Sequence, residues 1–560
     1  MTGPCAGGPP AACTADTAQA PPGPTRHPAE APAGGAPASA TPVGVQAPPG
    51  PDQPPAGAAP LGGASASATP APADLRTPTG PARRPAGRPP AAPDRVRLTW
   101  VQPEDLVGHE LRQAAEDGRD PGPALAAWLA AGGHPAPARA GASPAPAAPE
   151  LRALATRLLD GLAELPVPTA AAEPTDWPAI RATWPAPPDP ATRRPDPGLR
   201  RRLEAAWVGR AVGCVLGKPV EKLPLDGIRA LARAAGNWPL DDWFTARGVP
   251  APLLAAHPWN RRSAPTSLAE NIDGAPEDDD LNHPLLGLLL LQRHGKAFTT
   301  ADLARLWLDE LPAGRTFTAE RVAYRNLLQG LEPPHTATHH NPFREWIGAL
   351  IRADVHGWTN PGDPAAAAEQ AWRDATLTHT ASGVHAALFA AAAIAEAAGG
   401  RADVHGALRA GLAVVPPGSR LAEAVRHGIT AAREETRFDR AVDRLHARYG
   451  HYHWVHAVPN TALLAAALTH ADGDFTRSVC LAVSGGWDTD SNGATAGSVA
   501  GLLAGSPDRI PERWTAPLKN RLATTVAGFD GTGFDALAHL TARLATQPST
   551  QPATQEATRS

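Results

Sequence analysis

The sequence predicts an all-α protein with a disordered Pro/Ala-rich N-terminal arm, and three observations support this fold class. From about residue 198 to 545, Ala, Leu, Arg and Glu dominate and apolar residues recur every three or four positions, which is the period of an amphipathic helix. Alternating β-branched residues, which would predict strands, are nearly absent from this region. Pro, Ala, Gly, Ser and Thr dominate the residues before position 94. We therefore expect a compact multi-helical domain at 197–545 that follows a segment without a core.

Residues 1–93 form the predicted arm. They show no hydrophobic period, so they cannot bury enough apolar surface to offset the conformational entropy of folding. A tether or partner-binding segment remains open as a function, although the composition favours a simple solvated tail. We also expect the last segment, 546–560, to be disordered.

Between the arm and the main domain, residues 94–165 predict a short helical accessory segment and residues 166–196 a Pro-rich linker. Within the main domain, alanine-rich stretches such as 365–373 and 383–398 predict closely packed helices, because small side chains let helix axes approach. Functional residues are then expected in the loops between helices.

Composition excludes several classes of protein. The net charge of −4 over 560 residues gives no strong attraction for nucleic acid. The four cysteines do not make a disulfide framework, since Cys5 and Cys13 lie in the arm and Cys214 and Cys480 in apolar segments. The N-terminus has no signal-peptide pattern, and the longest apolar runs fall short of the roughly 20 residues needed to span a bilayer. We expect no membrane association and a cytoplasmic location.

Two acidic clusters about 200 positions apart are the strongest functional signal: Glu277-Asp278-Asp279-Asp280 and Asp488-Thr489-Asp490-Ser491. Carboxylates about 4 Å apart repel by roughly 4 kcal/mol at an effective dielectric constant near 20. A helix dipole at the start of the following helix accounts for one or two of them, but not for four. Oxygen ligands suit hard cations such as Mg²⁺ or Mn²⁺ better than zinc. The pattern predicts a two-metal hydrolytic centre.

A glycine repeat precedes the first cluster. Gly209, Gly213 and Gly217 are four positions apart, so they share one helix face, and Glu221 follows shortly after them. The Gly/Ala/Ser-rich helix after Asp490 has the small side chains needed to pack against that face. Taken alone, Glu221 would be interpreted as a solvated loop acid.

Two competing metal sites receive less support. The order of a calcium-binding EF-hand is missing from the loop around Asp488. His451, His453 and His456 would offer three imidazoles to zinc, but no thiolates or repeated spacing accompany them. Stacking on adenine or ordinary packing is the better interpretation of this aromatic segment.

With these motifs in place, the chain resembles the ADP-ribosylglycohydrolase family, which includes dinitrogenase-reductase-activating glycohydrolase and the ADP-ribosyl-acceptor hydrolases. The resemblance covers about residues 199 to 540. Four blocks follow the family's order: the glycine helix ending in Glu221, the acidic tetrad, the segment 341–379, and the loop Gly485-Gly486-Trp487-Asp488-Thr489-Asp490 with its small-residue helix. Each block alone is weak evidence, whereas the ordered set is specific.

The resemblance implies two divalent cations, Mg²⁺ or Mn²⁺, and roles for individual residues. Glu277 and Asp280 stand where many members have threonine, which adds negative charge to this chain. Glu221 and Asp279 are the expected catalytic residues, and Asp354 and His379 the expected substrate-binding residues. The expected metal ligands are Glu277, Asp278, Asp279, Asp488, Asp490 and Ser491.

The implied reaction is hydrolysis of the glycosidic bond between the anomeric carbon of ADP-ribose and an acceptor. The acceptor can be a protein side chain, a nucleobase or a small molecule. The expected partner is therefore an ADP-ribosylated protein or small molecule. Nucleic acid is a less favoured partner, and an ADP-ribosylated base stays open as a substrate. Two alternatives stay open. One is a non-catalytic ADP-ribose-binding member of the same fold, and the other a two-metal phosphoesterase that releases phosphate or AMP.

Overall fold

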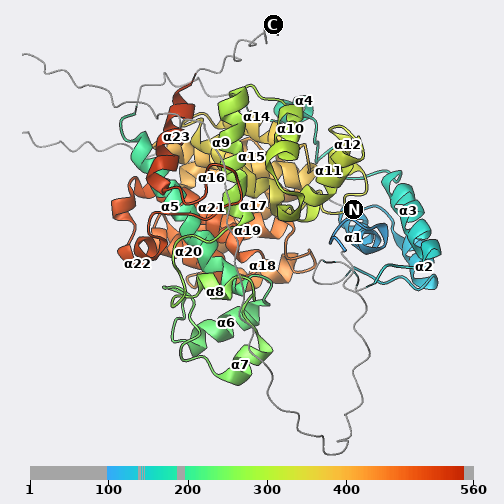
Figure 1. Cartoon of the computed structure of the whole chain (residues 1–560), viewed down its shortest axis with the longest axis horizontal. Coiled ribbons are helices and arrows are strands. Elements are labelled where there is room, and N and C mark those ends of the chain that lie inside the picture. The colour runs from blue at the N-terminus through green and yellow to red at the C-terminus, as the bar shows by residue number, and fades with distance from the viewer. Residues whose placement is uncertain (1–96, 137–140, 142, 144, 186–195, 548–560) are drawn as a thin grey trace, which may run out of the picture. The chain divides into compact units, whose positions relative to one another are not determined.

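Helices make up the regular structure of the computed structural model, which describes residues 97–136, 141, 143, 145–185 and 196–547 (Figure 1). Within these residues the strand-type pairings are two isolated bridges, Ala275 with Leu522 and Trp346 with His456. The prediction of an all-α fold is therefore confirmed. The predicted arm, 1–93, and all but the first two residues of the predicted tail, 546–560, lie outside the described residues.

Four helices precede the main domain. They are α1 (Pro103–Glu116), α2 (Gly122–Ala130), α3 (Pro149–Ala163) and α4 (Trp177–Ala182). The first three lie in the predicted accessory segment, where α3 packs against both α1 and α2. The fourth lies inside the predicted linker, 166–196. All four belong to the same compact unit as the main domain, and the domain boundaries drawn from sequence stay predictions.

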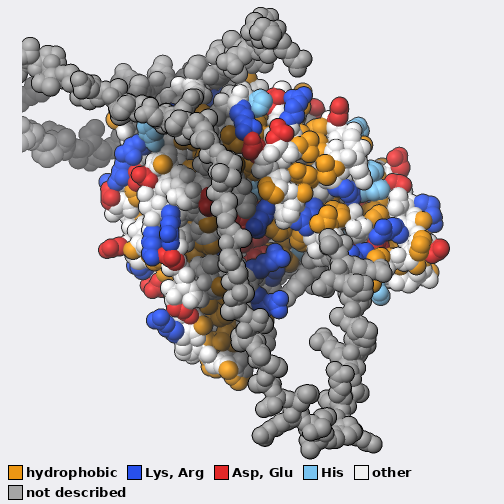
Figure 2. All heavy atoms as spheres, viewed as in Figure 1, with side chains coloured by type: hydrophobic (Ala, Val, Ile, Leu, Met, Phe, Trp, Pro, Cys, Tyr) orange, Lys and Arg blue, Asp and Glu red, His pale blue; other side chains and the backbone are white. Residues whose placement is uncertain are grey.

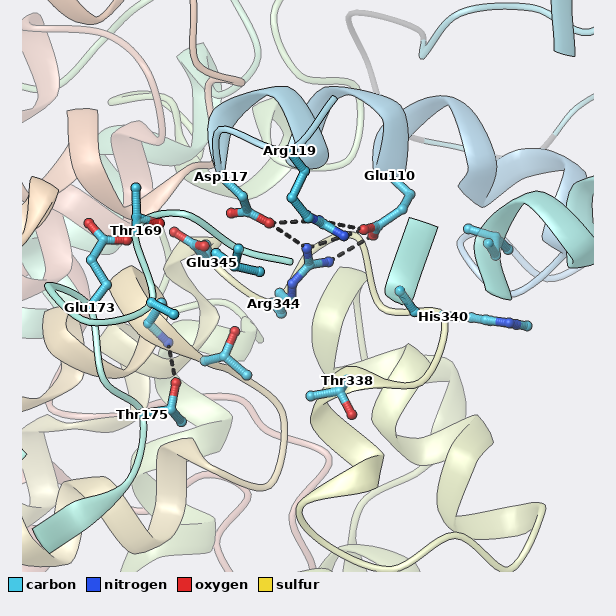
Figure 3. Close-up of a pocket in the computed structure, with 16 residues that line it drawn as sticks. Glu110, Asp117, Arg119, Thr169, Glu173, Thr175, Thr338, His340, Arg344 and Glu345 are labelled. Carbon is cyan, nitrogen blue, oxygen red and sulfur yellow. Dashed lines mark hydrogen bonds and ion pairs between the residues drawn. The ribbon is translucent and has the colours of Figure 1, made fainter. Parts of the chain in front are cut away.

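Buried ion pairs attach this first part to the main domain, as Figure 3 shows. The Arg344 guanidinium lies 2.7 Å from Glu110 Oε2 and 2.8 Å from Asp117 Oδ2. Arg119 contacts the same two carboxylates at 2.8 and 2.6 Å. All four side chains line a cavity of about 280 Å³. Because removing one partner of a buried pair leaves an uncompensated charge, these contacts fix the accessory helices to the domain.

The main domain contains nineteen α-helices and five short 3₁₀ helices within the described residues. In chain order they are α5 (Leu199–Gly217), η1 (Lys218–Val220), α6 (Leu225–Ala234), α7 (Ala251–Ala256), α8 (Ala264–Ser267), α9 (Asp279–His294), α10 (Thr300–Glu310), η2 (Ala313–Arg315), α11 (Thr318–Leu328), α12 (His335–Thr338), η3 (Ile347–Arg352), α13 (Asp354–Trp358), α14 (Pro364–Ala375), α15 (Ala381–Ala398), α16 (Val404–Ala413), α17 (Arg420–Glu434), α18 (Phe438–Tyr449), α19 (Ala457–Ala471), α20 (Phe475–Ser484), α21 (Thr489–Ala504), η4 (Pro507–Arg509), α22 (Glu512–Thr515), η5 (Ala516–Leu518) and α23 (Phe534–Thr546).

Helices α5 and α21 form the closest contact of the domain. A Cβ atom on Gly213 would lie 1.8 Å from the carbonyl oxygen of Gly493, and one on Gly497 would lie 1.9 Å from that of Gly209. Only glycine allows backbones to approach so closely. The contacts run in opposite directions along the two helices, so α5 and α21 are antiparallel. The expected packing of the small-residue helix against the glycine face is confirmed.

Helix α15 lies in the interior between α14 and α16. Within the described residues it is long and apolar enough to cross a membrane, but 89% of that apolar stretch is buried inside the domain. Burial of this kind is typical of a core helix. Its alanines allow the close helix packing that the sequence predicts.

Candidate metal centre

Three chain segments meet at one end of the α5–α21 pair. Glu221 follows η1 at the end of α5, the acidic tetrad 277–280 leads into α9, and Asp488 directly precedes α21. Because the two helices are antiparallel, the end of α5 lies beside the start of α21, where the Thr489 hydroxyl donates to the carbonyl oxygen of Gly217 at 2.8 Å. Segments that are remote in sequence therefore share one small region.

The tetrad and the second acidic cluster are in direct contact. Ser491 Oγ donates to Asp280 Oδ2 at 3.4 Å. Carboxylate oxygens of Asp278 and Asp280 and the sulfur of Cys214 lie within 4.8 Å of one another, an arrangement that could hold a metal ion. Among the four tetrad residues, Asp278 and Asp280 are buried and Asp279 is half-buried.

The electrostatics of the cluster call for counterions. Burial, followed by the charge of Asp278, raises the pKa of Asp279 well above its usual value, and the same causes raise the pKa of Asp280. Burial and the neighbouring Asp490 raise the pKa of Asp488, while burial and Glu221 raise the pKa of Asp490 to about 7. Bound cations would remove this penalty and keep the carboxylates ionised at neutral pH.

Lys218 already supplies one cation. Its ammonium forms an ion pair with Asp278, and it lies 3.4 Å from the carbonyl oxygen of Glu277. Burial alone would raise the pKa of Asp278, but Lys218 outweighs burial and holds that pKa below its usual value. Asp278 also caps α9 by accepting the backbone N–H of Asp280 at 2.9 Å. A metal ion at Asp278 would have to share the carboxylate with the lysine.

Arg210 supplies a second cation beneath the tetrad. Its Nη1 lies 2.8 Å from Asp354 Oδ2 and its Nη2 3.3 Å from Asp280 Oδ1, while its Nε donates to the Asp280 carbonyl oxygen at 2.8 Å. Arg210 and Asp354 are both 0% exposed. Asp354 therefore fixes the arginine that in turn holds the first turn of α9. Its expected role in substrate binding stays a prediction, and its burial favours positioning over direct contact.

Comparison with known proteins shows the family of this chain. The family model described as ADP-ribosylglycohydrolase matches residues 195–552. The chain belongs to the ADP-ribosylglycohydrolase family. Membership supports a glycohydrolase-type enzyme that acts on ADP-ribosylated substrates. A similar solved structure, described as an "ADP-ribosylglycohydrolase-related protein complex", shares 22% identity over 62% of this chain and 99% of its own, with a TM-score of 0.39. No curated protein matches the sequence.

Two residues expected to act at the site of this family member are held by neighbouring side chains. Glu277 accepts from Asn282 at 2.8 Å and pairs with Arg315 at 3.0 Å, so both carboxylate oxygens are engaged by groups outside the acidic cluster. Glu221 accepts from Asn260 at 2.7 Å and pairs with the ammonium of Lys222 at 2.6 Å. Glu277 as a metal ligand and Glu221 as a catalytic residue stay predictions.

His379 lies in the interior and not in the acidic cluster. It is 0% exposed, and its Nδ1 lies 2.5 Å from the Thr378 hydroxyl, which also accepts from Arg352 at 2.9 Å. Burial, followed by the charge of Arg352, holds the pKa of His379 well below its usual value. A neutral imidazole in this place orders the core, and its expected contact with substrate stays a prediction.

The structure adds three residues that the motifs did not indicate: Arg210, Cys214 and Lys218. They stand four positions apart, Arg210 and Cys214 on α5 and Lys218 at the start of η1 directly after it, and all three reach the acidic cluster. That spacing is visible in the sequence. The glycines at the preceding positions have the same four-residue spacing, and the sequence pattern was interpreted through those glycines alone.

The histidine segment after α18 is packed into the fold. The ring of His453 stacks on Trp346 with centroids 4.1 Å apart and an interplanar angle of 10°, and both residues are buried. Among the described residues, the group whose ligand atoms lie within 4.8 Å of one another is at Cys214, Asp278 and Asp280, and these histidines do not belong to it. The geometry agrees with ordinary packing of this segment.

Proposed function

We propose that this protein hydrolyses the glycosidic bond between ADP-ribose and an acceptor at a binuclear Mg²⁺ or Mn²⁺ centre. The observation that carries the proposal is the meeting of the α9 and α21 acidic clusters beside the end of α5. Carboxylate and hydroxyl oxygens are the ligands that hard cations prefer. The residues present therefore fit such ions.

A charge count supports two ions. The carboxylates whose charges interact here number seven, and the cationic side chains three. When all are ionised, the excess is four negative charges, which two divalent cations would balance. The carboxylates are Glu221, Asp278, Asp279, Asp280, Asp354, Asp488 and Asp490, and the cations are Arg210, Lys218 and Lys222.

Each side chain then has a chemical task. Asp278, Asp279, Asp488, Asp490 and Ser491 would hold the ions. When bound, the ions lower the pKa of water and orient the ribose hydroxyls. Glu221 is only partly buried, and its carboxylate would accept the proton of the attacking water. Asn260 and Lys222 fix the Glu221 carboxylate, and Asp279, also half-buried, could take the same role.

The ion pair between Lys218 and Asp278 favours a second candidate, the ADP-ribose-binding member without hydrolysis. The ammonium neutralises a carboxylate that a metal ion would otherwise use. A single remaining ion could still hold ADP-ribose without activating water. Binding and turnover must therefore be measured separately.

A release assay tests the proposal. Arginine-linked, serine-linked and nucleic-acid-linked ADP-ribose are incubated with the protein in Mg²⁺, in Mn²⁺ and in chelator, and the products are separated by chromatography. We expect intact ADP-ribose from at least one substrate, and loss of release in chelator and in Asp490→Ala. Asp309→Ala, at an exposed position on α10, is the control and should keep full activity.

Three results would contradict the proposal. Release that is indifferent to chelator and to Asp490→Ala would refute the metal site. Release of AMP or phosphate would indicate a phosphoesterase. Tight binding of ADP-ribose without release from any of the linkages would favour the non-catalytic member.

A further inference from the structure

A second cavity, of about 580 Å³, lies between the first described residues and helix α11. Its volume is within the range of small-molecule sites, roughly 300–1,000 Å³. The lining combines apolar side chains such as Leu98 and Leu328 with two arginines of α11, Arg321 and Arg325. Figure 2 shows hydrophobic side chains gathered over α10 and α11, the helices that carry the exposed Leu308 and Leu328.

Arg321 is held by neutral groups. Its guanidinium carbon lies 5.0 Å from the ring centroid of Trp100 and 5.7 Å from that of Phe317. Its Nη1 donates to the Thr99 hydroxyl at 2.6 Å and its Nη2 to the Gly314 carbonyl oxygen at 3.3 Å, while its Nε has no acceptor. The guanidinium lies over two aromatic rings, and no carboxylate among the described residues pairs with it.

Arg325, one helical turn further on, is in the same situation. It donates to the carbonyl oxygens of Val101 and His339 at 3.2 and 3.0 Å, and to the side-chain oxygen of Asn326 at 2.8 Å. All of these acceptors are neutral. The two guanidinium groups therefore bring two positive charges to one cavity.

Arg321 is buried and Arg325 half-buried, and the pair contrasts with other buried or half-buried arginines of the chain. Four of them each have two carboxylates within 4 Å: Arg119, Arg210, Arg344 and Arg352. Among the residues that the structure describes, Arg321 and Arg325 have none. A buried charge without a partner costs several kcal/mol in effective desolvation. Among the described residues, no carboxylate therefore balances these two charges in the cavity.

The pKa values of the two arginines agree with this geometry. Burial lowers the pKa of Arg325 to about 10, and burial together with the nearby Arg262 lowers the pKa of Arg321. A bound anion would reverse both shifts. Guanidinium groups present paired N–H donors that match phosphate and carboxylate oxygens.

One segment of the cavity lining also contacts the candidate metal centre. Ala313 and Thr316 line it, and Arg315 between them pairs with Glu277 of the acidic tetrad. Arg262, whose charge acts on Arg321, follows closely after Asn260, the residue that donates to Glu221. The segment that lines the cavity thus also contacts the acidic tetrad, through Arg315.

We propose that this cavity binds the phosphate group of a small molecule through Arg321 and Arg325. Two sources of that phosphate are distinguishable. One is the diphosphate of the ADP-ribosyl substrate, which rests on the proposed function. The other is a separate phosphate compound that binds independently of it.

Calorimetry at low ionic strength tests the site without requiring turnover. Inorganic phosphate is titrated into the wild-type full-length protein, Leu328→Glu and Leu328→Gln. Leu328 is 69% exposed and lies three residues after Arg325 on the same helix face, so both variants should fold. We expect the new glutamate carboxylate to pair with the guanidinium groups and to weaken phosphate binding at least tenfold. The glutamine has the same size without charge and should weaken phosphate binding much less than the glutamate. Arg321→Gln should also lose at least tenfold.

A second titration with ADP-ribose separates the sources. If phosphate competes with ADP-ribose and Leu328→Glu weakens both, the substrate's diphosphate occupies the cavity. If both bind together, the occupant is a separate phosphate compound. Absence of phosphate binding to the wild type, or equal binding by Leu328→Glu and Leu328→Gln, would overturn the proposal. Failure of ADP-ribose to bind while phosphate still binds would contradict the proposed function and leave the phosphate site standing.

Discussion

Replacing Gly213 by alanine should disturb both stability and the metal centre. The added Cβ would lie 1.8 Å from the Gly493 carbonyl oxygen, whereas ordinary contact begins at 3.4 Å. Helices α5 and α21 would have to separate by about 1.5 Å. Overpacking of this kind typically costs about 1–3 kcal/mol of unfolding free energy. The same shift acts one turn away, where Gly217 meets Thr489 at the acidic cluster, so we expect Mn²⁺ affinity and any turnover to fall by roughly 10²-fold.

Denaturant unfolding and Mn²⁺ calorimetry measure the two effects. Gly161→Ala is the matched control, because Gly161 lies in α3 and an added Cβ there meets nothing within 4 Å. Removing backbone freedom in a helix should stabilise that variant by about 0.5–1 kcal/mol. An unchanged unfolding free energy and unchanged Mn²⁺ affinity in Gly213→Ala would refute the reasoning about helix contact.

Two further predictions concern protonation and ions. Burial and the charge of Glu345 raise the pKa of Glu116 from 4.5 to about 8. The folded state therefore holds the Glu116 proton more tightly than the unfolded state. As a result, the contribution of Glu116 to the unfolding free energy falls as pH rises from about 4.5 to about 8. Glu116→Gln should remove that slope and exceed the wild type by a few kcal/mol at pH 8; parallel unfolding curves across pH would contradict this. Under the proposed function, Mn²⁺ at about 100 times its Kd should raise the unfolding free energy of the wild type by about 2.7 kcal/mol. The double variant Asp488→Asn/Asp490→Asn should gain nothing. An equal gain in both proteins would exclude Asp488 and Asp490 as metal ligands.

Much of the fold could be predicted because its signals are local. Helical periodicity and the glycine spacing at 209, 213 and 217 depend on residues a few positions apart, and a face of glycines has few packing solutions. The same argument indicated the contact with the helix after Asp490. The docking of α1 against the main domain could not be foreseen, since it depends on Arg344 meeting Glu110 and Asp117 from a distant segment.

The candidate site was predictable only as a set of acids. Four successive carboxylates signal a counterion whatever the fold, so the tetrad stood out without any structure. Which counterion each one takes depends on three-dimensional neighbours. Glu277 faces Arg315, Asp278 faces Lys218, and Asp280 faces Arg210, although the sequence gives no preference among these pairings.

The arginines show why pairing must be read from the structure. Arg210 and Arg321 both lie in helices and both are buried, so composition treats them alike. Arg210 has two carboxylates and serves the internal charge balance, whereas Arg321 stacks on aromatic rings and has none among the described residues. A buried cation that is paired with an anion of the chain stabilises the fold. A buried cation without such an anion would instead stabilise a bound anionic ligand. The acidic cluster and the α11 cavity therefore carry charges of opposite sign that the described residues do not fully neutralise. Each of them thus specifies the charge of its ligand.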